Sequence, residues 1–437
     1  MDAKTVAVVG GGFTGISAAY DLAKAGYKVI LVEKDHELGG LAGTFEIQPG
    51  IRIEKFYHHW FTSDTAILNL IQEAGLASGL KYIPSNTGLY YANSIFRLAG
   101  PLDLLRFTAI PLLDRIRTGL MALAARRIND WKALEDQSAE EWLIRMGGKK
   151  AYETIWRPLL IGKFGPEASE VSAVWIWNKL KLRGSSRNSR GAECLIYYQG
   201  SFGALTEALR HKLLELGVQI LTGRQVHEIC IEGGKPTGLR VEADLIPAHI
   251  VLATIPIPQF LQITPGLPAE YRESAARIRY LGNICLVMRL KQSLSSTYWL
   301  NVADPQFPFV GIIEHTNFDD ISNYRGEHIA YLSKYLPVSD GLFSKSDDEY
   351  LEYCLPYIGR MFPAFSRNWI IDHKLWKADF SQPVITRRYS SLIPDMQTPL
   401  RNLWLCSMAQ IYPEDRGTNY AVAYGRKVAA RIIASGH

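Results

Sequence analysis

Three glycines near the start of the chain have the spacing that binding a dinucleotide diphosphate requires. Gly10, Gly12 and Gly15 follow the apolar run 6–9 and precede an apolar helical pattern that ends at Gly26. The first glycine allows a strand to turn, the second lets the backbone approach a diphosphate, and the third lets helix and strand pack closely. The free N–H groups and the dipole at the helix N-terminus then favour the phosphate charge.

An acidic residue follows at the position where such sites bind a ribose. Residues 27–32 form a second apolar run, and Glu33 comes directly after it. A carboxylate about twenty residues beyond the glycines accepts the ribose 2′-hydroxyl and disfavours a 2′-phosphate. Strand, glycine turn, helix, second strand and acid together predict the first half of a βαβ nucleotide-binding unit.

A second glycine pair distinguishes FAD from NAD as the nucleotide. Gly39 and Gly40 come just after the second strand, where an NAD domain has no use for bare backbone but an extended FAD does. With Glu33 and Thr44, the two glycine motifs resemble those of the flavoprotein superfamily of amine oxidases, protoporphyrinogen oxidase, phytoene desaturases and UDP-galactopyranose mutase. The resemblance implies FAD as the cofactor, but it does not specify the reaction.

The resemblance also implies FAD contacts in the second half of the chain. In the superfamily, the residue at Val226 holds the adenine through backbone hydrogen bonds, and the strand before Thr254 leads to the cofactor. A final helix that opens within 412–421 is expected to point its N-terminus at the flavin pyrimidine. The FAD-binding residues implied in this way are Gly10, Gly12, Phe13, Thr14, Gly15, Glu33, Lys34, Gly39, Gly40, Leu41, Ala42, Thr44, Val226, Thr254, Asn419, Tyr420 and Ala421.

One position departs from the superfamily pattern. Ser407 and Met408 stand where relatives carry a Gly-Asp pair that contacts the FAD phosphates or ribityl chain. Backbone contacts can survive this exchange, whereas the carboxylate contact cannot.

The expected fold class is α/β. A Rossmann-like FAD-binding domain of the glutathione-reductase type is built from discontinuous segments, and an α+β substrate domain adds an antiparallel sheet and a helical subdomain. The predicted boundaries are 1–81, 193–261 and 386–437 for the FAD-binding domain, 82–192 for the helical subdomain and 262–385 for the antiparallel sheet.

Local patterns predict further elements inside these segments. Ser63 and Asp64 are expected to cap a helix over 65–74, and Ser138 with Glu141 forms a capping box. Other expected elements are a hairpin at 90–98, helices within 102–128, strands at 214–221, 284–290, 309–314, 329–335 and 403–410, and a hairpin over 239–251.

Composition indicates an ordinary globular protein. The 437 residues are 47% hydrophobic and 21% charged, and the five cysteines lack the spacing of a zinc site or a disulfide framework. A reducing, cytoplasmic setting is therefore expected, with no metal, no signal peptide and no membrane span. The net charge of +5 is mild. It fits anionic ligands or a membrane surface, and no nucleic-acid partner is expected.

Candidate catalytic residues lie in two places. In UDP-galactopyranose mutase, a histidine-rich segment near the flavin corresponds to residues 55–64; His58 matches its first histidine, and Phe61 replaces its second. His58 or His59 is expected to touch flavin or substrate, the alternative being that both pack in a polar corner. Arg416 is expected to serve a reduced flavin or a substrate anion, the alternative being a structural pair with Asp415.

Several residues are candidates for substrate binding. Arg157 and Lys163 lie in a segment similar to the helical substrate domain of protoporphyrinogen oxidase, with surface salt bridging as the alternative, and His315 is either a ligand contact or part of a turn. The basic run 179–191 is a solvated loop, a lid or an anchor for a diphosphate. Arginines among leucines in 102–128 form either an ordinary helical subdomain or a surface that contacts a membrane.

Three functions remain open from the sequence. The first is an FAD-dependent oxidoreductase that takes hydride from a C–N or C–C bond of a small molecule to the flavin N5 atom. The second is a non-redox flavoenzyme similar to UDP-galactopyranose mutase, acting on a nucleotide- or lipid-linked sugar, and the third is a flavin-binding protein without turnover. The chain has no second Gly-x-Gly-x-x-Gly, so a built-in NAD(P)H domain is not expected. The sequence leaves the oligomeric state open.

Overall fold

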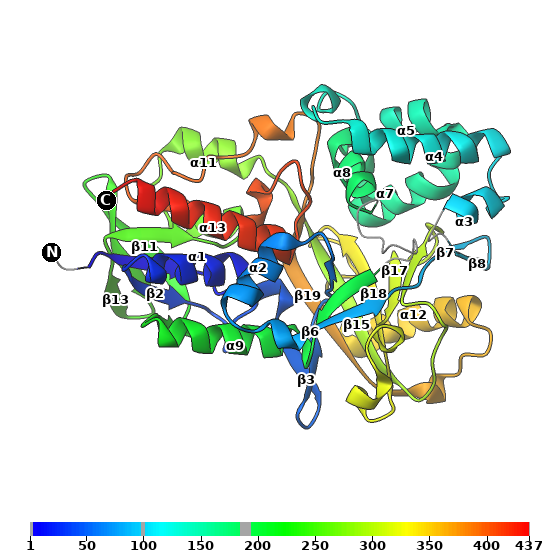
Figure 1. Cartoon of the computed structure of the whole chain (residues 1–437), viewed down its shortest axis with the longest axis horizontal. Helices are drawn as coiled ribbons and strands as arrows, with labels where there is room; N and C mark the ends of the chain where they lie inside the picture. Colours follow the sequence, from blue (N-terminus) through cyan, green and yellow to red (C-terminus); the bar gives the residue numbers. More distant parts are fainter. Residues whose placement is uncertain (1–2, 98–100, 184–193, 437) are drawn as a thin grey trace.

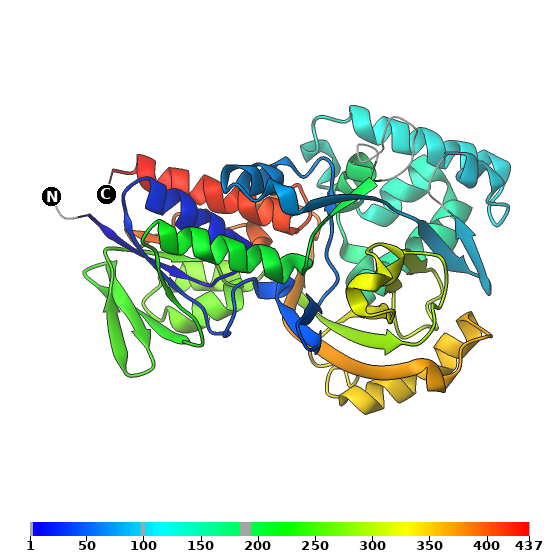
Figure 2. The same cartoon turned by 60° about the horizontal axis from the view of Figure 1, so that its bottom comes forward.

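The computed structural model describes residues 3–97, 101–183 and 194–436. It has two lobes, and both chain ends lie on the same one (Figure 1). That lobe holds α1, α9 and α13, whereas α3, α4, α5, α7 and α8 lie in the other lobe. The second view shows the long strands of the second lobe running beneath these helices (Figure 2).

A five-stranded parallel sheet forms the centre of the first lobe. Four of its strands, β1, β2, β14 and β20, are almost fully buried, as expected for near-continuous Val, Ile and Leu runs covered on both faces, whereas the edge strand β10 is partly exposed. Their order is β10-β2-β1-β14-β20. The strands are β1 (Thr5–Val9), β2 (Lys28–Val32), β10 (Gln219–Leu221), β14 (Ile250–Ala253) and β20 (Leu403–Leu405). Strands from three distant segments of the chain therefore build one sheet.

Three helices pack together beside this sheet. They are α1 (Phe13–Lys24), α9 (Ser201–Glu215) and α13 (Thr418–Ala434), and they lie side by side in Figure 1. The predicted strand at 214–221 is wrong in its first half, because α9 continues to Glu215 and the strand begins only at Gln219. Helix α9 has a buried stripe made of Leu205, Leu209 and Leu213. Gly217, with φ of +78°, makes the turn that follows the helix.

Antiparallel strands and short helices complete the first lobe. The segment expected to form a hairpin over 239–251 is divided between an antiparallel three-stranded sheet and the parallel sheet, where β14 pairs with β1 and β20. The elements are β3 (Thr44–Gln48), β4 (Ile51–Glu54), α2 (Thr65–Glu73), β11 (Val226–Glu232), β12 (Lys235–Val241), β13 (Asp244–Pro247), α10 (Ile257–Ile263) and α11 (Ala269–Ala276).

A seven-stranded sheet spans the second lobe. Its order is β19-β15-β18-β17-β16-β7-β8, from β7 (Thr87–Tyr91), β8 (Ser94–Arg97), β15 (Tyr280–Leu290), β16 (Trp299–Val302), β17 (Gly311–Glu314), β18 (His328–Leu336) and β19 (Ile370–Pro383). The expected antiparallel strands are present, with α12 (Asp347–Met361) packed against β15 and β19. The prediction of a purely antiparallel sheet from 262–385 is corrected in two respects: β7 and β8 join it from 87–97, and β7 pairs with β16 in parallel.

Helices form the rest of the second lobe. They are α3 (Pro101–Arg106), α4 (Leu112–Arg127), α5 (Ala139–Gly147), α6 (Lys149–Ala151), α7 (Arg157–Phe164) and α8 (Ala173–Arg183). The capping box of Ser138 and Glu141 is present at the start of α5. The basic run expected as a loop is helical over 179–183, and its remainder lies outside the described residues. Within the described ranges, none of the helices is both long and apolar enough to cross a membrane.

A small sheet joins the two lobes. Its strands are β5 (Trp60–Phe61), β6 (Leu80–Pro84) and β9 (Cys194–Tyr198), in the order β5-β9-β6. It fixes the segment that holds the two neighbouring histidines, because β5 follows them directly. The two histidines therefore directly precede the small sheet between the lobes.

Candidate functional site

The two glycine loops meet backbone to backbone at the carboxyl ends of β1 and β2. Gly39 N donates to Gly11 O at 2.9 Å, and Gly12 pairs with Gly39 as an isolated parallel bridge. A Cβ on Gly15 would lie only 2.0 Å from the carbonyl oxygen of Gly10, so no side chain fits there. The two sequence motifs therefore form one surface without side chains at the carboxyl ends of the parallel strands.

The N-terminus of α1 suits a diphosphate. Gly12 is its N-cap. In the described chain no side chain caps the free N–H groups of this helix, and its first turn holds no acidic residue that would neutralise the helix dipole. A Cβ added to Gly12 would meet only the Cα of Gly40, 4.0 Å away, so the space beside the loop is open. Free N–H groups, a positive helix dipole and open space match the phosphates of FAD.

Glu33 and Thr254 hold this loop in shape. Glu33 accepts hydrogen bonds from Gly11 N at 2.6 Å and from Asp35 N at 2.9 Å, and its burial raises the pKa of the carboxyl group. The Thr254 hydroxyl donates to the carbonyl oxygens of Val9 and Gly10 at 3.0 and 2.9 Å. Thr254 therefore supports the turn from behind, while Glu33 stands beside the glycine loop, where a ribose is expected.

The remaining predicted FAD residues divide into buried and exposed ones. Phe13, Ala42 and Val226 are buried, and Thr44 accepts a hydrogen bond from Arg52 Nε at 3.2 Å. The Lys34 side chain is exposed. The other predicted positions, all in the two glycine loops or at the start of α13, are Thr14, Gly40, Leu41, Tyr420 and Ala421.

A turn replaces the acidic contact that relatives carry after β20. Ser407 N donates to the Gln410 side chain at 2.6 Å, and residues 408–410 form a single helical turn. The strand predicted over 403–410 therefore ends at Leu405. Within this turn Gln410 N donates to Ser407 O at 3.0 Å and Ile411 N donates to Met408 O at 3.2 Å, so the backbone groups of Ser407 already have partners.

The N-terminus of α13 is fixed by its own side chains but keeps its backbone donors. Trp60 Nε1 donates to the Thr418 hydroxyl at 2.7 Å, and the Asn419 side chain accepts from Ala66 N and Ile67 N at 2.9 and 3.2 Å. Asn419 therefore caps α2. The N-cap of α13, Gly417, makes no side-chain cap within the described residues, so the first turn presents its N–H groups and the positive end of the helix dipole.

The expected cap of α2 is thereby corrected. Asp64 is the N-cap residue, but its side chain accepts from Phe61 N at 2.9 Å rather than from the helix. The helix starts at Thr65, as predicted, yet its free N–H groups are satisfied by Asn419 from the other end of the chain.

Asn419→Ala is expected to lower the free energy of unfolding by about 1–2 kcal/mol, because two buried N–H groups of α2 lose their acceptor. The matched change Asn129→Ala, at an exposed position, is expected to stay within about 0.5 kcal/mol. Urea unfolding of the two variants checks this. Equal midpoints for both variants would contradict the assigned capping role.

His58 and His59 have different surroundings. His58 Nδ1 lies 2.5 Å from the carbonyl oxygen of Phe56 and so carries the proton, which leaves Nε2 as an acceptor. Burial, aided by the Arg416 charge, lowers the pKa of His58 to about 4, so the ring is neutral at pH 7. His59 contacts Tyr298, with its Nδ1 2.9 Å from the hydroxyl, and packs edge-on against aromatic rings. His59 thus matches the packing alternative.

A cluster of charges faces the same region from the helical subdomain. Lys163 of α7 and Lys179 of α8 place their Nζ atoms 3.6 and 2.5 Å from Asp415 Oδ2, and Asp415 is 5% exposed. Both lysines also lie over the Trp175 ring. Burial opposes the charge of Asp415, but the two lysines and Arg416 outweigh it and lower its pKa. For Lys163, burial dominates and lowers the pKa to about 7.

Arg416 joins this cluster without pairing directly with Asp415. Its Nε donates to Gln382 Oε1 at 3.0 Å and its Nη2 to the Tyr335 hydroxyl at 2.7 Å. Gln382 Nε2 lies 3.5 Å from Asp415 Oδ1 and connects the two weakly. In the described part of the chain, one carboxylate, Asp415, thus lies among three cations: it pairs with Lys163 and Lys179 and neighbours Arg416. Their surplus positive charge favours an anionic ligand.

Not all sequence candidates lie here. Arg157 is exposed at the start of α7 and lines a separate hollow of about 370 Å³ with Tyr152 and Glu140. His315 belongs to a buried turn and bonds the Tyr324 hydroxyl through Nε2 at 2.7 Å, which matches the turn alternative. The surface-salt-bridge alternative for Lys163 does not describe it, because its partner Asp415 is buried.

Two members of the site carry no sequence motif: Tyr335 and Gln382, which lie near the ends of strands β18 and β19. Lys179 lies in the basic run for which an anchor of a diphosphate is one alternative, but it stands on helix α8 and not in a loop. Only the spacing of Trp175 and Lys179, four residues apart, could have placed an aromatic ring and a cation on one helix face.

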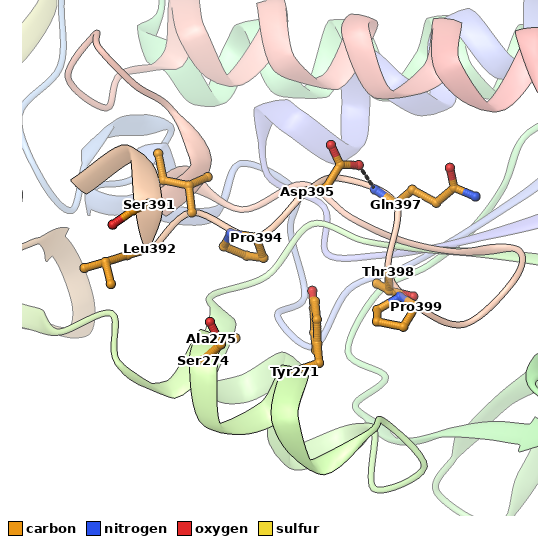
Figure 3. Close-up of a pocket in the computed structure, with 11 residues that line it drawn as sticks. Tyr271, Ser274, Ala275, Ser391, Leu392, Pro394, Asp395, Gln397, Thr398 and Pro399 are labelled. Atoms are coloured by element: carbon orange, nitrogen blue, oxygen red, sulfur yellow. Dashed lines mark hydrogen bonds between the residues drawn. The ribbon is translucent and has the colours of Figure 1, made fainter. Parts of the chain in front are cut away.

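A further hollow lies away from this cluster. It measures about 450 Å³ and opens between α11 and the segment 391–399, lined by Tyr271, Pro394 and Asp395 (Figure 3). Asp395 pairs with Arg431 near the C-terminal end of α13, about 20 Å along the helix from its N-terminus. This hollow is therefore separate from the cofactor cradle. No group of three or more His, Cys, Asp or Glu in the described ranges is arranged to hold a metal ion.

The fold and the cradle define a flavoprotein class. The model of the family of flavin-containing amine oxidoreductases matches residues 13–433, and the chain belongs to this family. Its cofactor is FAD, which the open glycine cradle and the two helix N-termini fit.

Relatives of several activities share this fold. The (S)-6-hydroxynicotine oxidase of Paenarthrobacter nicotinovorans is 28% identical over 61% of this chain and 63% of its own length, so the chain spans less than two thirds of that relative. A structure from Exiguobacterium sp. 255-15, provisionally named a protoporphyrinogen oxidase, covers 100% of both chains with TM-score 0.78 and 18% identity. Reduced UDP-galactopyranose mutase covers 99% of this chain and 94% of its own, with TM-score 0.79 and 15% identity. At these identities the two structures establish the fold alone.

Proposed function

We propose that the protein is an FAD-dependent oxidoreductase that takes hydride from a C–N or C–C bond of a small molecule carrying an acidic group. Bound FAD supplies the hydride acceptor, its N5 atom. The observation that carries the proposal is the buried surplus of positive charge around Asp415, which adjoins the N-terminus of α13.

Different groups of the chain have different roles in this reaction. Lys163, Lys179 and Arg416 bind and orient the acidic group of the substrate, because charge-assisted hydrogen bonds are strong where water is excluded. The N-terminus of α13 stabilises negative charge that develops on the flavin ring. His58, neutral and with a free Nε2, accepts the proton that leaves the substrate.

His58→Phe is expected to lower kcat by about 10²–10⁴-fold without loss of bound flavin, because a positioned general base contributes that much. His227→Phe, at an exposed position on β11, is the matched control and should leave kcat unchanged. Steady-state kinetics with a flavin absorbance spectrum for each variant tests the role. Unchanged turnover in His58→Phe removes this residue from the mechanism.

The pH dependence of substrate binding follows from Lys163. Because its pKa is lowered from 10.5 to about 7, the side chain is cationic below pH 7 and loses its charge above it. KM for an acidic substrate should therefore rise, by about tenfold or more, between pH 6 and pH 9. In Lys163→Met, KM should be high and flat over this range. A KM that falls with pH in the parent protein would contradict the assignment.

Anaerobic mixing with candidate substrates tests the redox proposal. Acidic amines and other acidic compounds with an oxidisable C–N or C–C bond should bleach the oxidised flavin spectrum, and neutral analogues should do so at least tenfold more slowly. Comparing metabolite pools before and after incubation with the enzyme narrows the substrate. No bleaching by any acidic compound, with the flavin bound, contradicts the proposal.

A mutase-like reaction is the second candidate. The same three cations suit the diphosphate of a nucleotide- or lipid-linked sugar, and His58 aligns with a histidine of the mutase segment. This reaction would proceed only after reduction with dithionite and without net redox change. Activity of that kind on a sugar nucleotide would replace the oxidoreductase proposal.

We also propose a cytoplasmic enzyme with peripheral contact to a membrane. The contact is proposed because α3 and α4 carry arginines among exposed leucines. An acidic, lipid-linked substrate would suit such a location.

A further inference from the structure

Helix α4 has two apolar faces. Met121 and Ala125 are buried against the rest of the helical subdomain, as in any amphipathic helix. On the other side, large apolar side chains of α3 and α4 face the solvent. These side chains, 45 to 66% exposed, are Leu102, Leu105, Leu112, Leu113, Ile116, Leu120 and Leu123. We call them the leucine face.

The members of the leucine face are neighbours. Leu112, Ile116, Leu120 and Leu123 are three or four residues apart, so they form one stripe along α4. Arg115 joins the two helices, since its Nη1 donates to Leu105 O and its Nε to Ile110 O, at 2.7 and 2.8 Å. Both helices lie at the outer edge of the second lobe, away from the chain ends (Figures 1 and 2).

Seven of the sixteen exposed large apolar side chains among the described residues belong to the leucine face. Single exposed leucines are normal, but a contiguous apolar patch beyond a few hundred Å² marks an interaction surface. Core packing does not account for these residues either, because the buried side of α4 is already supplied by Met121 and Ala125.

The charge around the face is positive. Residues 101–128 contain five arginines and two aspartates. One of the acids, Asp114, is turned inward and accepts from Ala151 N at 3.3 Å. Arg106 is the last residue of α3 and Arg127 the last residue of α4, and both are exposed. Apolar side chains bordered by arginines match the acyl and headgroup layers of an anionic bilayer.

We propose that the leucine face rests on an anionic lipid surface and docks the enzyme in the interface without crossing the bilayer. The inference rests on the peripheral contact of the proposed function, but not on its redox chemistry. The face is one helix layer from the charge cluster, because α4 packs on α8, which carries Lys179. Docking thus brings the substrate-binding helices to the membrane surface.

Vesicle flotation tests the docking. The flavin-bound protein should float with phosphatidylglycerol/phosphatidylcholine vesicles. The variant Ile116→Gln/Leu120→Gln/Leu123→Gln should bind at least tenfold more weakly, since glutamine keeps helix propensity but not apolar contact. Arg106→Gln/Arg127→Gln should lose about tenfold on the anionic vesicles and little on pure phosphatidylcholine. Leu214→Gln/Leu245→Gln, exposed apolar positions in the other lobe, should float like the parent.

Two readouts separate this inference from the proposed function. Bound flavin and turnover of a water-soluble substrate should be unchanged in the triple variant, so a failed redox proposal leaves the flotation result intact. Flotation that is absent in the parent, or equal in parent and triple variant, overturns the docking. Light scattering that gives a dimer for the parent and a monomer for the triple variant assigns the face to a second copy and also overturns it.

Discussion

Gly12→Asp is expected to give a folded protein that binds FAD at least about 100-fold more weakly. The new carboxylate takes the N-cap position of α1 and accepts from its free N–H groups, which stabilises the apoprotein by up to about 1 kcal/mol. The same carboxylate fills the site of the diphosphate and repels its negative charge. A Cβ at Gly12 meets no nearer atom of the described chain than Gly40 Cα, at 4.0 Å, so the fold tolerates the change.

Visible absorbance of the purified protein and its thermal midpoint check this result together. Gly341→Asp makes the same substitution at an exposed glycine with no described atom within 4 Å, and it should remain as yellow as the parent. Gly15→Ala is the contrasting variant. Its Cβ would lie 2.0 Å from Gly10 O, so the fold itself should lose roughly 1–3 kcal/mol despite the better helix propensity of alanine. A yellow Gly12→Asp protein would refute the position of the cradle.

Asp415→Asn is expected to lower the free energy of unfolding by about 3 kcal/mol. The change leaves Lys163 and Lys179 without the buried carboxylate that they share, and uncompensated buried charge is costly. The value lies at the low end of the usual range because the Lys179 side chain, 36% exposed, can turn to water. Asp395→Asn, which removes an exposed partner of Arg431, should cost less than about 1 kcal/mol.

The pH dependence of this difference has a definite sign. The pKa of Asp415 is lowered in the folded protein, so its contribution is complete above the unfolded-state pKa of about 3.9. It declines as the pH falls through the folded-state pKa. Urea unfolding of parent and variant should therefore differ most above pH 4 and converge in stronger acid.

A double substitution identifies which lysine carries the cost. Lys163, 19% exposed, is the more buried partner, so Asp415→Asn/Lys163→Met should recover more stability than Asp415→Asn/Lys179→Met. Equal recovery of stability in the two double variants would show that the cost does not depend on how deeply each lysine is buried. If the Asp415→Asn variant is as stable as the parent protein, Asp415 does not compensate the charges of Lys163 and Lys179.

Local chemistry made the cofactor cradle predictable. Gly10, Gly12 and Gly15 act through contacts within one turn of chain, and Glu33 ends the adjacent strand, so residue type and spacing carry the needed information. The capping box of Ser138 and Glu141 was predictable for the same reason, because both partners lie within one helical turn.

Long-range partners were not predictable from such patterns. The cap of α2 comes from Asn419, and β7 finds its parallel partner β16 more than two hundred residues along the chain. In the segment 214–221, apolar residues suited a strand, and packing of Leu213 against the core made its beginning part of a helix. Periodicity indicates which face is buried, but it does not indicate what that face is buried against.

The sequence by itself determined the nucleotide-binding unit and the second glycine loop, because both depend on the backbone freedom of glycines and on burial patterns within a short stretch of chain. Only the tertiary structure decided that Lys163, Lys179 and Arg416 gather around Asp415, that His58 is neutral while His59 packs, and that the apolar face of α3 and α4 is left to solvent. These features depend on distance, desolvation and shared charge between segments far apart in the chain, and such quantities exist only once the chain has folded.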